Sequence, residues 1–202
     1  MSHERALILR QATSGESFLK LDILTPSDGA FLCLKRISKK RIEQVAPDLF
    51  DTATLQLEPS KQGGARFVSD YELITRRQNI GRSYHSLCHA SDYCALLARN
   101  APNMTDTELL FKLAERSLDA FASGKAAEVV HLKSIYLLLK GEGYPIRESW
   151  WPNLRADARA QVQELINSPA PQQTANNSRT NCEQIISGLY RWMERETDLV
   201  QP

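Results

Sequence analysis

The segment from Lys35 to Arg41 carries five positive charges and no acidic residue. It continues a stretch in which apolar and other residues alternate, so the cations stand at the end of a predicted strand and in the turn after it. Each lysine or arginine that neutralises a DNA phosphate releases condensed counterions, so such a cluster could hold a nucleic-acid backbone without reading its sequence. A solvated strand end is the alternative interpretation. The cations are Lys35, Arg36, Lys39, Lys40 and Arg41.

Four further arginines in and after the fifth predicted strand could extend this surface, because we expect that strand to run near the first strand of a small barrel. They are Arg66, Arg76, Arg77 and Arg82. Proteins that bind single strands also stack bases on aromatic rings. Phe31, Phe67 and Tyr71 are available for stacking, although each also suits the barrel core.

A different chemistry is suggested by a group of metal-ligand residue types at His85, Cys88, His89 and Asp92. Their spacing of i, i+3, i+4 and i+7 places all four on one face of a helix. One helix rarely supplies a full tetrahedral ligand set, and Cys88 can instead pack as a small apolar residue between two histidines at its border. We therefore expect no metal and no other cofactor. A metallohydrolase that uses His85 and His89 stays open as an alternative.

Other catalytic patterns are absent from the sequence. It contains no P-loop motif, no G-x-G-x-x-G and no G-x-S-x-G. The carboxylates are scattered, without the paired cluster that nuclease metals need. These absences predict a protein that is not an enzyme.

Five short β-type segments in the first part of the chain would position the cations. In 52–58, Ala53, Leu55 and Leu57 alternate with other residues, which is the period-two pattern of a half-buried strand. In the second segment, Phe18 faces away from the apolar side. Five such strands match an OB barrel or a five-stranded SH3-like barrel, and periodicity does not separate the two. The predicted strands are Ala6–Gln11, Phe18–Leu24, Ala30–Ile37, Thr52–Glu58 and Arg66–Ile74.

From Gly81 onward, the spacing of apolar residues becomes helical. Thr105 with Glu108 predicts a capping box at the start of one helix, and Pro152 predicts the first turn of another. The helix 126–140 is apolar nearly all round, which is typical of the central helix of a domain. The predicted helices are Ser83–Asn100, Thr105–Gly124, Ala126–Lys140, Pro152–Ile166 and Cys182–Thr197, with a mobile loop at 168–181.

These elements predict an α+β protein with an N-terminal five-stranded OB-type β-barrel in 1–79, followed by an all-α helical domain in 80–202. The 202 residues carry a net charge of +1, so any nucleic-acid binding must depend on the local cluster. The first residues lack the apolar stretch of a signal peptide, and no apolar run approaches the roughly 18 residues of a membrane span. We expect a cytoplasmic, nucleoid-associated protein without membrane contact.

Several short runs near the N-terminus form a recognisable pattern: Leu9-Arg10, Ser14-Gly15-Glu16, Leu24-Thr25, Gly29 and the basic cluster. This pattern resembles the start of the DNA repair protein RecO family, which opens with a small OB domain and continues into a helical domain. The segment Leu137–Pro145 is similar to a helix and turn of the RecO helical domain. The resemblance adds Arg10 to the expected nucleic-acid-binding residues.

The resemblance also implies a function. RecO proteins are non-enzymatic recombination mediators in DNA repair, which anneal complementary strands and help to load the RecA recombinase onto DNA coated by single-strand-binding protein. The implied partners are single- and double-stranded DNA, RecR and the tail of single-strand-binding protein. Because that tail is acidic and apolar, we expect it to bind an apolar groove with lysine or arginine side chains at its edge, on the helical domain. Its candidate contacts are Lys112, Arg116, Lys133 and Arg155.

One departure from the family concerns zinc. Some RecO proteins hold zinc with cysteines directly after the turn that corresponds to Gly141–Pro145, whereas this chain has Ile146–Pro152 there, without a cysteine. We therefore expect no zinc. The near-neutral charge and the missing cysteines leave a second function open, a protein-interaction adaptor whose barrel no longer binds DNA.

Overall fold

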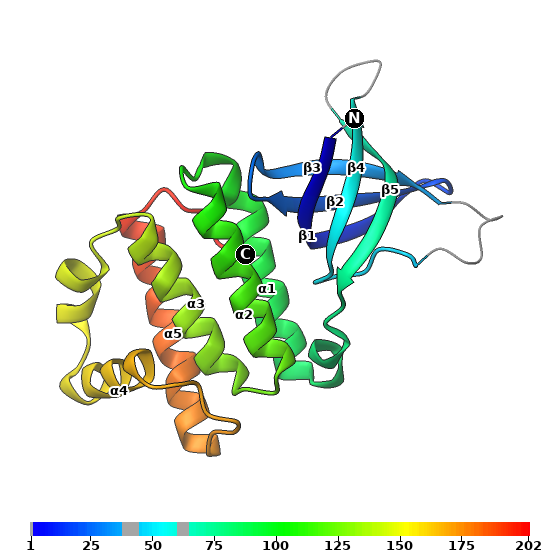
Figure 1. The fold of residues 1–202 in the computed structure, drawn as a ribbon. Coiled ribbons are helices and arrows are strands. Elements are labelled where there is room, and N and C mark those ends of the chain that lie inside the picture. The colour runs from blue at the N-terminus through cyan, green and yellow to red at the C-terminus, as the bar shows by residue number, and fades with distance from the viewer. Residues whose placement is uncertain (1, 38–44, 60–64) are drawn as a thin grey trace. The chain divides into compact units, whose positions relative to one another are not determined.

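The computed structural model describes residues 2–37, 45–59 and 65–202 (Figure 1). They form two compact units, one made of the residues up to 77 together with 97–115, and the other of 78–96 together with 116–202. The sequence predicted a single boundary at residue 79, whereas 97–115 groups with the barrel.

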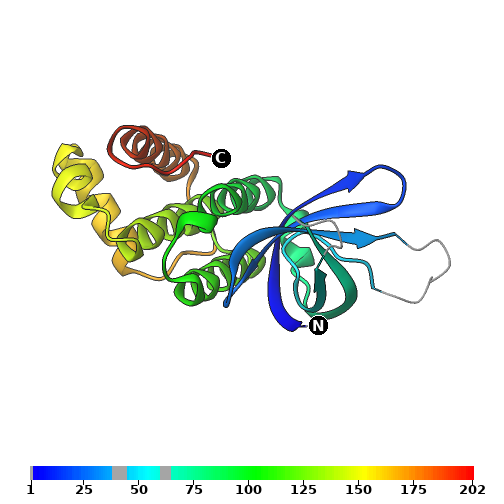
Figure 2. The ribbon, with the colours of Figure 1, turned by 90° about the horizontal axis from the view of Figure 1, so that it is seen from above.

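Five strands form a closed barrel in the first unit, as the sequence predicted (Figures 1 and 2). The strands are β1 (Ser2–Ser14), β2 (Phe18–Thr25), β3 (Gly29–Arg36), β4 (Thr52–Pro59) and β5 (Arg66–Thr75). Their order around the barrel is β1-β2-β3-β5-β4, and β4 pairs with β1 to close it. β5 therefore pairs with β3 and β4 and not with β1, which corrects its expected place. The parallel pairing of β3 with β5 is OB-like and differs from the antiparallel neighbours of an SH3-like barrel.

Alternation along the strands fills the barrel interior, as the period-two patterns predicted. A β-bulge between Ile8 and Arg10 interrupts the register of β1, and Leu7, Ile8 and Leu9 are all buried around it. The core of the barrel consists of Ala6, Ile8, Leu21, Ile23, Cys33, Ala53, Leu55, Leu57 and Val68.

The segment 97–115 packs against the turn between β2 and β3. The hydroxyl group of Thr107 donates a hydrogen bond of 2.6 Å to the carbonyl oxygen of Pro26. Gly29 ends this turn with a φ of +70°, and a Cβ atom built on it would lie 3.1 Å from the Cγ2 atom of Thr107. Glycine therefore meets two requirements at this position, the positive φ and the close approach of Thr107.

The helical unit contains α3 (Ala127–Gly141), which is buried on nearly all sides, as predicted for a central helix. α3 lies beside α5 (Asn176–Glu196) in both views (Figures 1 and 2). None of the described helices is long and apolar enough to cross a membrane. The remaining helical segments are η1 (Gln78–Arg82), α1 (Tyr84–Asn100), η2 (Ala101–Asn103), α2 (Thr107–Ala122), η3 (Ile146–Trp150), η4 (Trp151–Asn153) and α4 (Ala156–Asn167).

The start of α2 differs from the prediction. The carboxylate of Asp106 accepts a hydrogen bond of 2.9 Å from the backbone N–H of Leu109, so Asp106 caps the helix. The predicted capping box of Thr105 and Glu108 is therefore wrong. Leu109, in the first turn of α2, is half exposed.

Two other boundaries differ for local reasons. Pro152 lies in the short η4 and not in α4, because Leu154 and Arg155 adopt extended backbone before α4 begins. α5 begins at Asn176, earlier than predicted, so only 168–175 of the predicted loop lies outside a helix.

Candidate nucleic-acid interface

The register of three strands brings side chains into one row on the outside of the barrel. Lys20 of β2 lies opposite Leu34 of β3, and Leu34 lies opposite Phe67 of β5. Directly paired residues project from the same side of a sheet, and successive residues project from opposite sides. Since the next residues along two of these strands, Leu21 and Cys33, are buried in the core, the row faces outward.

The adjacent rows add two arginines and a second aromatic ring. Phe18 lies opposite Arg36, and Arg10 lies opposite Asp22, with 3.9 Å between the guanidinium and the carboxylate. Arg10, Lys20 and Arg36 are all exposed. We call this surface the outer-face patch, and its members are Arg10, Phe18, Lys20, Leu34, Arg36 and Phe67.

The two phenylalanines of the patch form an aromatic pair. The ring centroids of Phe18 and Phe67 lie 6.1 Å apart, within the usual range for interacting rings. Both side chains are only partly buried, so part of each ring faces solvent. Two acids also lie on this face, Asp22 opposite Arg10 and Glu58 opposite Phe67. An aromatic and aliphatic strip flanked by cations suits a single nucleic-acid strand, whose bases stack and whose phosphates need positive charge.

Two predicted cations lie on aromatic rings outside the patch. The guanidinium carbon of Arg66 lies 4.1 Å from the ring centroid of Phe31, and Arg66 also forms an ion pair with Asp28. The ammonium group of Lys35 lies 5.9 Å from the ring centroid of Tyr71. Both rings pack against the barrel core, as the core interpretation predicted.

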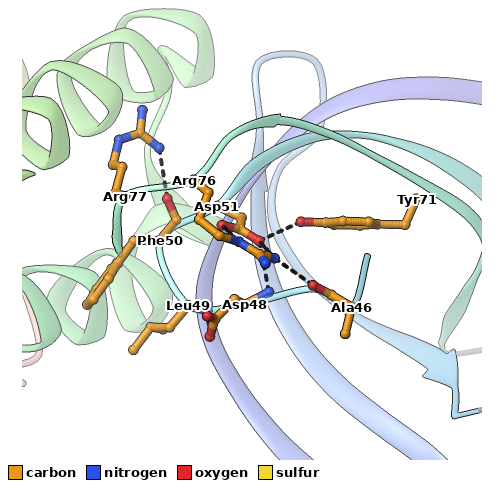
Figure 3. A network of polar contacts seen from close by, with 8 residues as sticks. All are labelled: Ala46, Asp48, Leu49, Phe50, Asp51, Tyr71, Arg76 and Arg77. Atoms are coloured by element: carbon orange, nitrogen blue, oxygen red, sulfur yellow. Dashed lines mark hydrogen bonds and ion pairs between the residues drawn. The ribbon is translucent and has the colours of Figure 1, made fainter. Parts of the chain in front are cut away.

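Arg76 belongs to a network of polar contacts around a buried carboxylate (Figure 3). Asp51 is fully buried and accepts hydrogen bonds from Nε and Nη2 of Arg76, at 3.1 and 2.7 Å. It also accepts bonds from the Tyr71 hydroxyl at 2.6 Å and from the backbone N–H of Asp48 at 2.9 Å. Burial and the hydrogen bond to Asp51 raise the pKa of Tyr71, and the hydrogen bond to Asp51 raises the pKa of Arg76. Arg76 therefore takes part in the polar network of the barrel, and its role in nucleic-acid binding stays a prediction.

Arg77 is buried, so it does not add to the surface as predicted. It donates hydrogen bonds of 2.8 Å to the carbonyl oxygen of Phe50 and of 2.9 Å to the hydroxyl of Thr52, and that hydroxyl donates to Glu115. Phe50 has a φ of +69°, a conformation that costs a non-glycine residue free energy. Its contacts hold it there, because its carbonyl binds Arg77 and its N–H donates to the carbonyl of Ile8 at 3.1 Å.

The sequence prediction thus identified part of the patch and missed part of it. Arg10 and Arg36 lie in it, as does Phe67, while Lys39, Lys40 and Arg41 lie outside the described residues. Phe18 and Lys20 were missed. The signal for Phe18 was its position on the polar side of an amphipathic strand, where a phenylalanine is unexpected. Lys20 is a single cation outside any charged run, so only the strand register identifies it.

The helical unit contains a groove of about 420 Å³ between η3, η4 and α5. Leu154 is partly exposed in it, while Trp150 and Trp192 are almost fully buried and reach it only with their edges. The indole N–H of Trp192 donates a hydrogen bond of 3.0 Å to Ser149. Cations from successive turns of α5 edge the groove. The charged residues that line it are Arg191, Glu194 and Arg195.

The cations predicted to bind a partner lie elsewhere. Lys112 forms an ion pair with Glu108, and the ammonium group of Lys133 donates to the carbonyl of Ser168. Arg155 pairs loosely with Asp157, 3.4 Å away. These residues do not line the groove, and neither does Arg116. The sequence analysis did not single out Arg191 and Arg195, because nothing in their spacing sets them apart from an ordinary solvated helix face.

The histidines of α1 do not assemble a metal site in the described residues. His89 shares a hydrogen bond of 2.8 Å between Nδ1 atoms with the buried His131, whose Nε2 lies 3.0 Å from the hydroxyl oxygen of Tyr190. His85 is exposed and lies 3.5 Å from Arg179. Within the described ranges, no group of three or more histidine, cysteine or acidic side chains is close enough together to hold an ion. The arrangement is a buried hydrogen-bonded chain, which the helical spacing alone did not predict.

Comparison with known proteins adds no family assignment. No protein-family model matches the chain, and no curated protein matches it in sequence. The functional interpretation therefore depends on the geometry above and on the resemblance of the sequence to RecO proteins.

Proposed function

We propose that the barrel binds single-stranded DNA along the outer-face patch. The observation that supports this most strongly is the row of Lys20, Leu34 and Phe67 across three strands, with an exposed arginine on either side. Such a row offers positive charge for phosphates next to apolar and aromatic surface for bases. The proposed face is also the one that OB-like barrels commonly use, around the second and third strands.

This mode of binding is independent of sequence. The patch offers aromatic faces and flexible cations, and every base has a π-face that can stack on a ring. Phosphate contacts position a strand and carry no direct information about its sequence. The protein would therefore bind single strands generally, with an affinity that falls steeply as salt concentration rises.

The similarity to RecO proteins gives this binding a place in DNA repair. We infer a non-enzymatic recombination mediator that anneals complementary strands and helps to load recombinase onto coated single strands, with RecR as a partner. Annealing brings two polyanions together, which requires neutralised phosphates and no nucleotide hydrolysis. A barrel with an exposed cationic face meets this requirement.

The groove of the helical unit supports the second part of this function. The tail of single-strand-binding protein is acidic and apolar, and the groove combines the partly exposed Leu154 and the edges of two buried tryptophans with Arg191 and Arg195. We propose that the tail binds here, in place of the cations first predicted for it. Aromatic and arginine side chains are the residue types that most often dominate such interfaces.

The same groove also favours a second candidate function, an adaptor that binds protein partners without DNA. Fluorescence anisotropy of labelled single-stranded DNA at rising salt, followed by mixing with the complementary strand, separates the two. If the protein is a mediator, the logarithm of its binding constant for DNA should fall linearly with the logarithm of the salt concentration. The complementary strands should then also anneal faster than they do without the protein. Weak binding that does not change with salt concentration, together with an unchanged annealing rate, would favour the adaptor function.

A further inference from the structure

The row of Lys20, Leu34 and Phe67 continues onto one more strand and ends in an acid. Glu58 of β4 lies directly opposite Phe67 of β5. The preceding residue of β4, Leu57, is buried in the barrel core, and successive residues of a strand project to opposite sides, so the side chain of Glu58 points outward. The complete row therefore starts with a positive charge on β2 and ends with a negative charge on β4.

The strands of this row carry further charges that are separated in the same way. On the positive side, Arg10 of β1 and Arg36 of β3 are exposed. On the negative side, Asp70 and Glu72 of β5 are exposed. They alternate with Tyr71, which packs against the core, so both acids share the outward side of the sheet. The outer surface of the barrel is thus mainly basic on β1 to β3 and acidic on β5 and β4.

Lys20 and Glu58 are too far apart to neutralise each other. Neighbouring strands lie about 4.8 Å apart, so two residues of one row that are separated by three such steps lie about 14 Å apart along the surface. Neither side chain forms an ion pair among the described residues. Both charges are therefore available to a ligand that crosses the row.

This separation of charge gives a bound strand a direction across the barrel. The phosphates of a single strand are attracted to the cations of β1 to β3 and repelled by the acids of β5 and β4. Leu34 and Phe67 lie between the two groups and present apolar and aromatic surface, on which bases stack. In the binding mode proposed above, the backbone therefore runs over the cationic side and the bases extend across Phe67 to Glu58.

We propose that Glu58 accepts hydrogen bonds from the amino groups of these bases, which gives the patch a preference for cytosine over thymine. This inference rests on the proposed single-strand binding and adds a determinant of base composition to it. An ionised glutamate side chain can only accept hydrogen bonds. Cytosine presents an N4 amino group, whereas thymine presents its O4 carbonyl oxygen at the same position. The carboxylate therefore attracts the edge of cytosine and repels the carbonyl edge of thymine.

The preference is an addition to general binding and does not replace it. Stacking and phosphate contacts accept every base, so a thymine strand still binds, but more weakly. Adenine and guanine also carry amino groups that Glu58 can bind. Because their rings are larger and stack differently, the two pyrimidines give the cleaner comparison.

Fluorescence anisotropy with oligo-dC and oligo-dT of equal length, at one salt concentration, tests the proposal. The readout is the ratio of the oligo-dC affinity to the oligo-dT affinity, because effects of overall charge cancel in it. Glu58→Ala should lower this ratio about fivefold, the lower end of the discrimination that one good contact to a base edge provides. Glu58→Gln keeps the size of the side chain, and its amide donates as well as accepts, so this second variant should lower the ratio too.

Asp22→Ala is the matched control. Asp22 is also an acid on the outer face, but it lies on the cationic side, opposite Arg10. Its replacement removes the same charge, so it should strengthen the binding of both oligonucleotides by the same factor and leave the ratio unchanged.

Two outcomes would overturn this inference while the proposed single-strand binding stands. In the first, both Glu58 variants bind the two oligonucleotides with the wild-type ratio. In the second, Asp22→Ala lowers the ratio as much as Glu58→Ala does, so the ratio follows net charge and not a contact to the bases. If the wild type binds neither oligonucleotide, the proposed function fails together with this inference.

Discussion

Asp51 and Arg76 form an ion pair through two hydrogen bonds, which joins the segment before β4 to the end of β5 (Figure 3). The carboxylate is fully buried, while 24% of the Arg76 side chain remains exposed. Because Asp51 also accepts bonds from the Tyr71 hydroxyl and the Asp48 amide, its two oxygens are well satisfied. The carboxylate is thus the centre of the polar network at this end of the barrel.

Replacing Asp51 by asparagine should lower the free energy of unfolding by about 3 kcal/mol, because the change leaves Arg76 partly buried without its counter-charge. Urea denaturation of the purified protein measures the loss. Asp70→Asn is the matched control, since Asp70 is exposed and bonds only its neighbour's backbone, and it should change stability by less than about 0.5 kcal/mol. Equal stabilities of the two variants would show that the network contributes little.

Gly29 and Gly15 allow the effect of a close contact to be separated from that of the backbone. Both have a positive φ, but a Cβ at Gly29 would lie 3.1 Å from Thr107, whereas one at Gly15 would meet nothing within 4 Å. Gly15→Ala should cost about 1 kcal/mol for the backbone alone. Gly29→Ala should cost clearly more in the same urea experiment. If both variants lose the same free energy of unfolding, the segment 97–115 can shift to accommodate the added methyl group at little cost.

Acid should destabilise the helical unit through His131. Burial, with a smaller contribution from His89, lowers the pKa of His131 to about 3. Between pH 6.5 and that value, the unfolded chain binds a proton that the folded chain does not, so the free energy of unfolding falls as the pH falls. The expected loss is up to about 1.4 kcal/mol per pH unit.

Thermal or urea unfolding between pH 7 and pH 5 measures this slope. His131→Gln removes the titrating group and should flatten the slope, whatever it does to stability at pH 7. A variant with the slope of the wild type would place the acid sensitivity in other groups.

The groove of the helical unit makes a prediction about the protein partner. Arg195→Glu should weaken binding of a peptide with the acidic, apolar sequence of a single-strand-binding-protein tail at least tenfold, because the charge at the edge of the groove is reversed. Isothermal titration calorimetry measures the affinity. Arg155→Glu tests the residue first predicted from the sequence, which lies outside the groove, and should leave the affinity unchanged. If Arg155→Glu weakened peptide binding and Arg195→Glu did not, the peptide would bind near the start of α4 and not in the groove.

The fold could be predicted from the sequence because its signals are local. All five strands and the central helix follow from the periodicity of apolar residues, as in Ala53, Leu55 and Leu57 of β4. The choice between an OB-like and an SH3-like barrel could not be made in this way. It depends on the parallel pairing of β3 with β5, a contact between strands far apart in the chain, which no local pattern encodes.

The candidate site was less predictable, because charge alone does not say where a side chain points. Arg76 and Arg77 looked like surface cations, but the structure directs them to a buried carboxylate and to backbone carbonyl groups. Lys20 carries no distinguishing pattern and enters the site only through its register with Leu34. Predictions of this kind require the pairing of strands, which a single sequence does not give.

Aromatic stacking at the patch has its own signature in DNA binding. Phe18→Ala with Phe67→Ala should reduce the affinity for single-stranded DNA by about 1–3 kcal/mol for each base that stacks, while leaving the salt dependence unchanged. Leu109→Ala removes an exposed apolar side chain elsewhere and serves as the control. An unchanged affinity in the double variant would show that bases do not stack on Phe18 and Phe67 when DNA binds.

The most direct test of the proposed interface is the slope of log affinity against log salt for single-stranded DNA, measured by fluorescence anisotropy. Each lost phosphate contact reduces that slope by about 0.7 for a single strand, so Lys20→Gln with Arg36→Gln should reduce it by about 1.4. Lys112→Gln with Arg116→Gln removes the same charge outside the patch and should keep the slope of the wild type. If the Lys20 and Arg36 variant has the wild-type slope and affinity, DNA does not bind on the outer face of β2, β3 and β5.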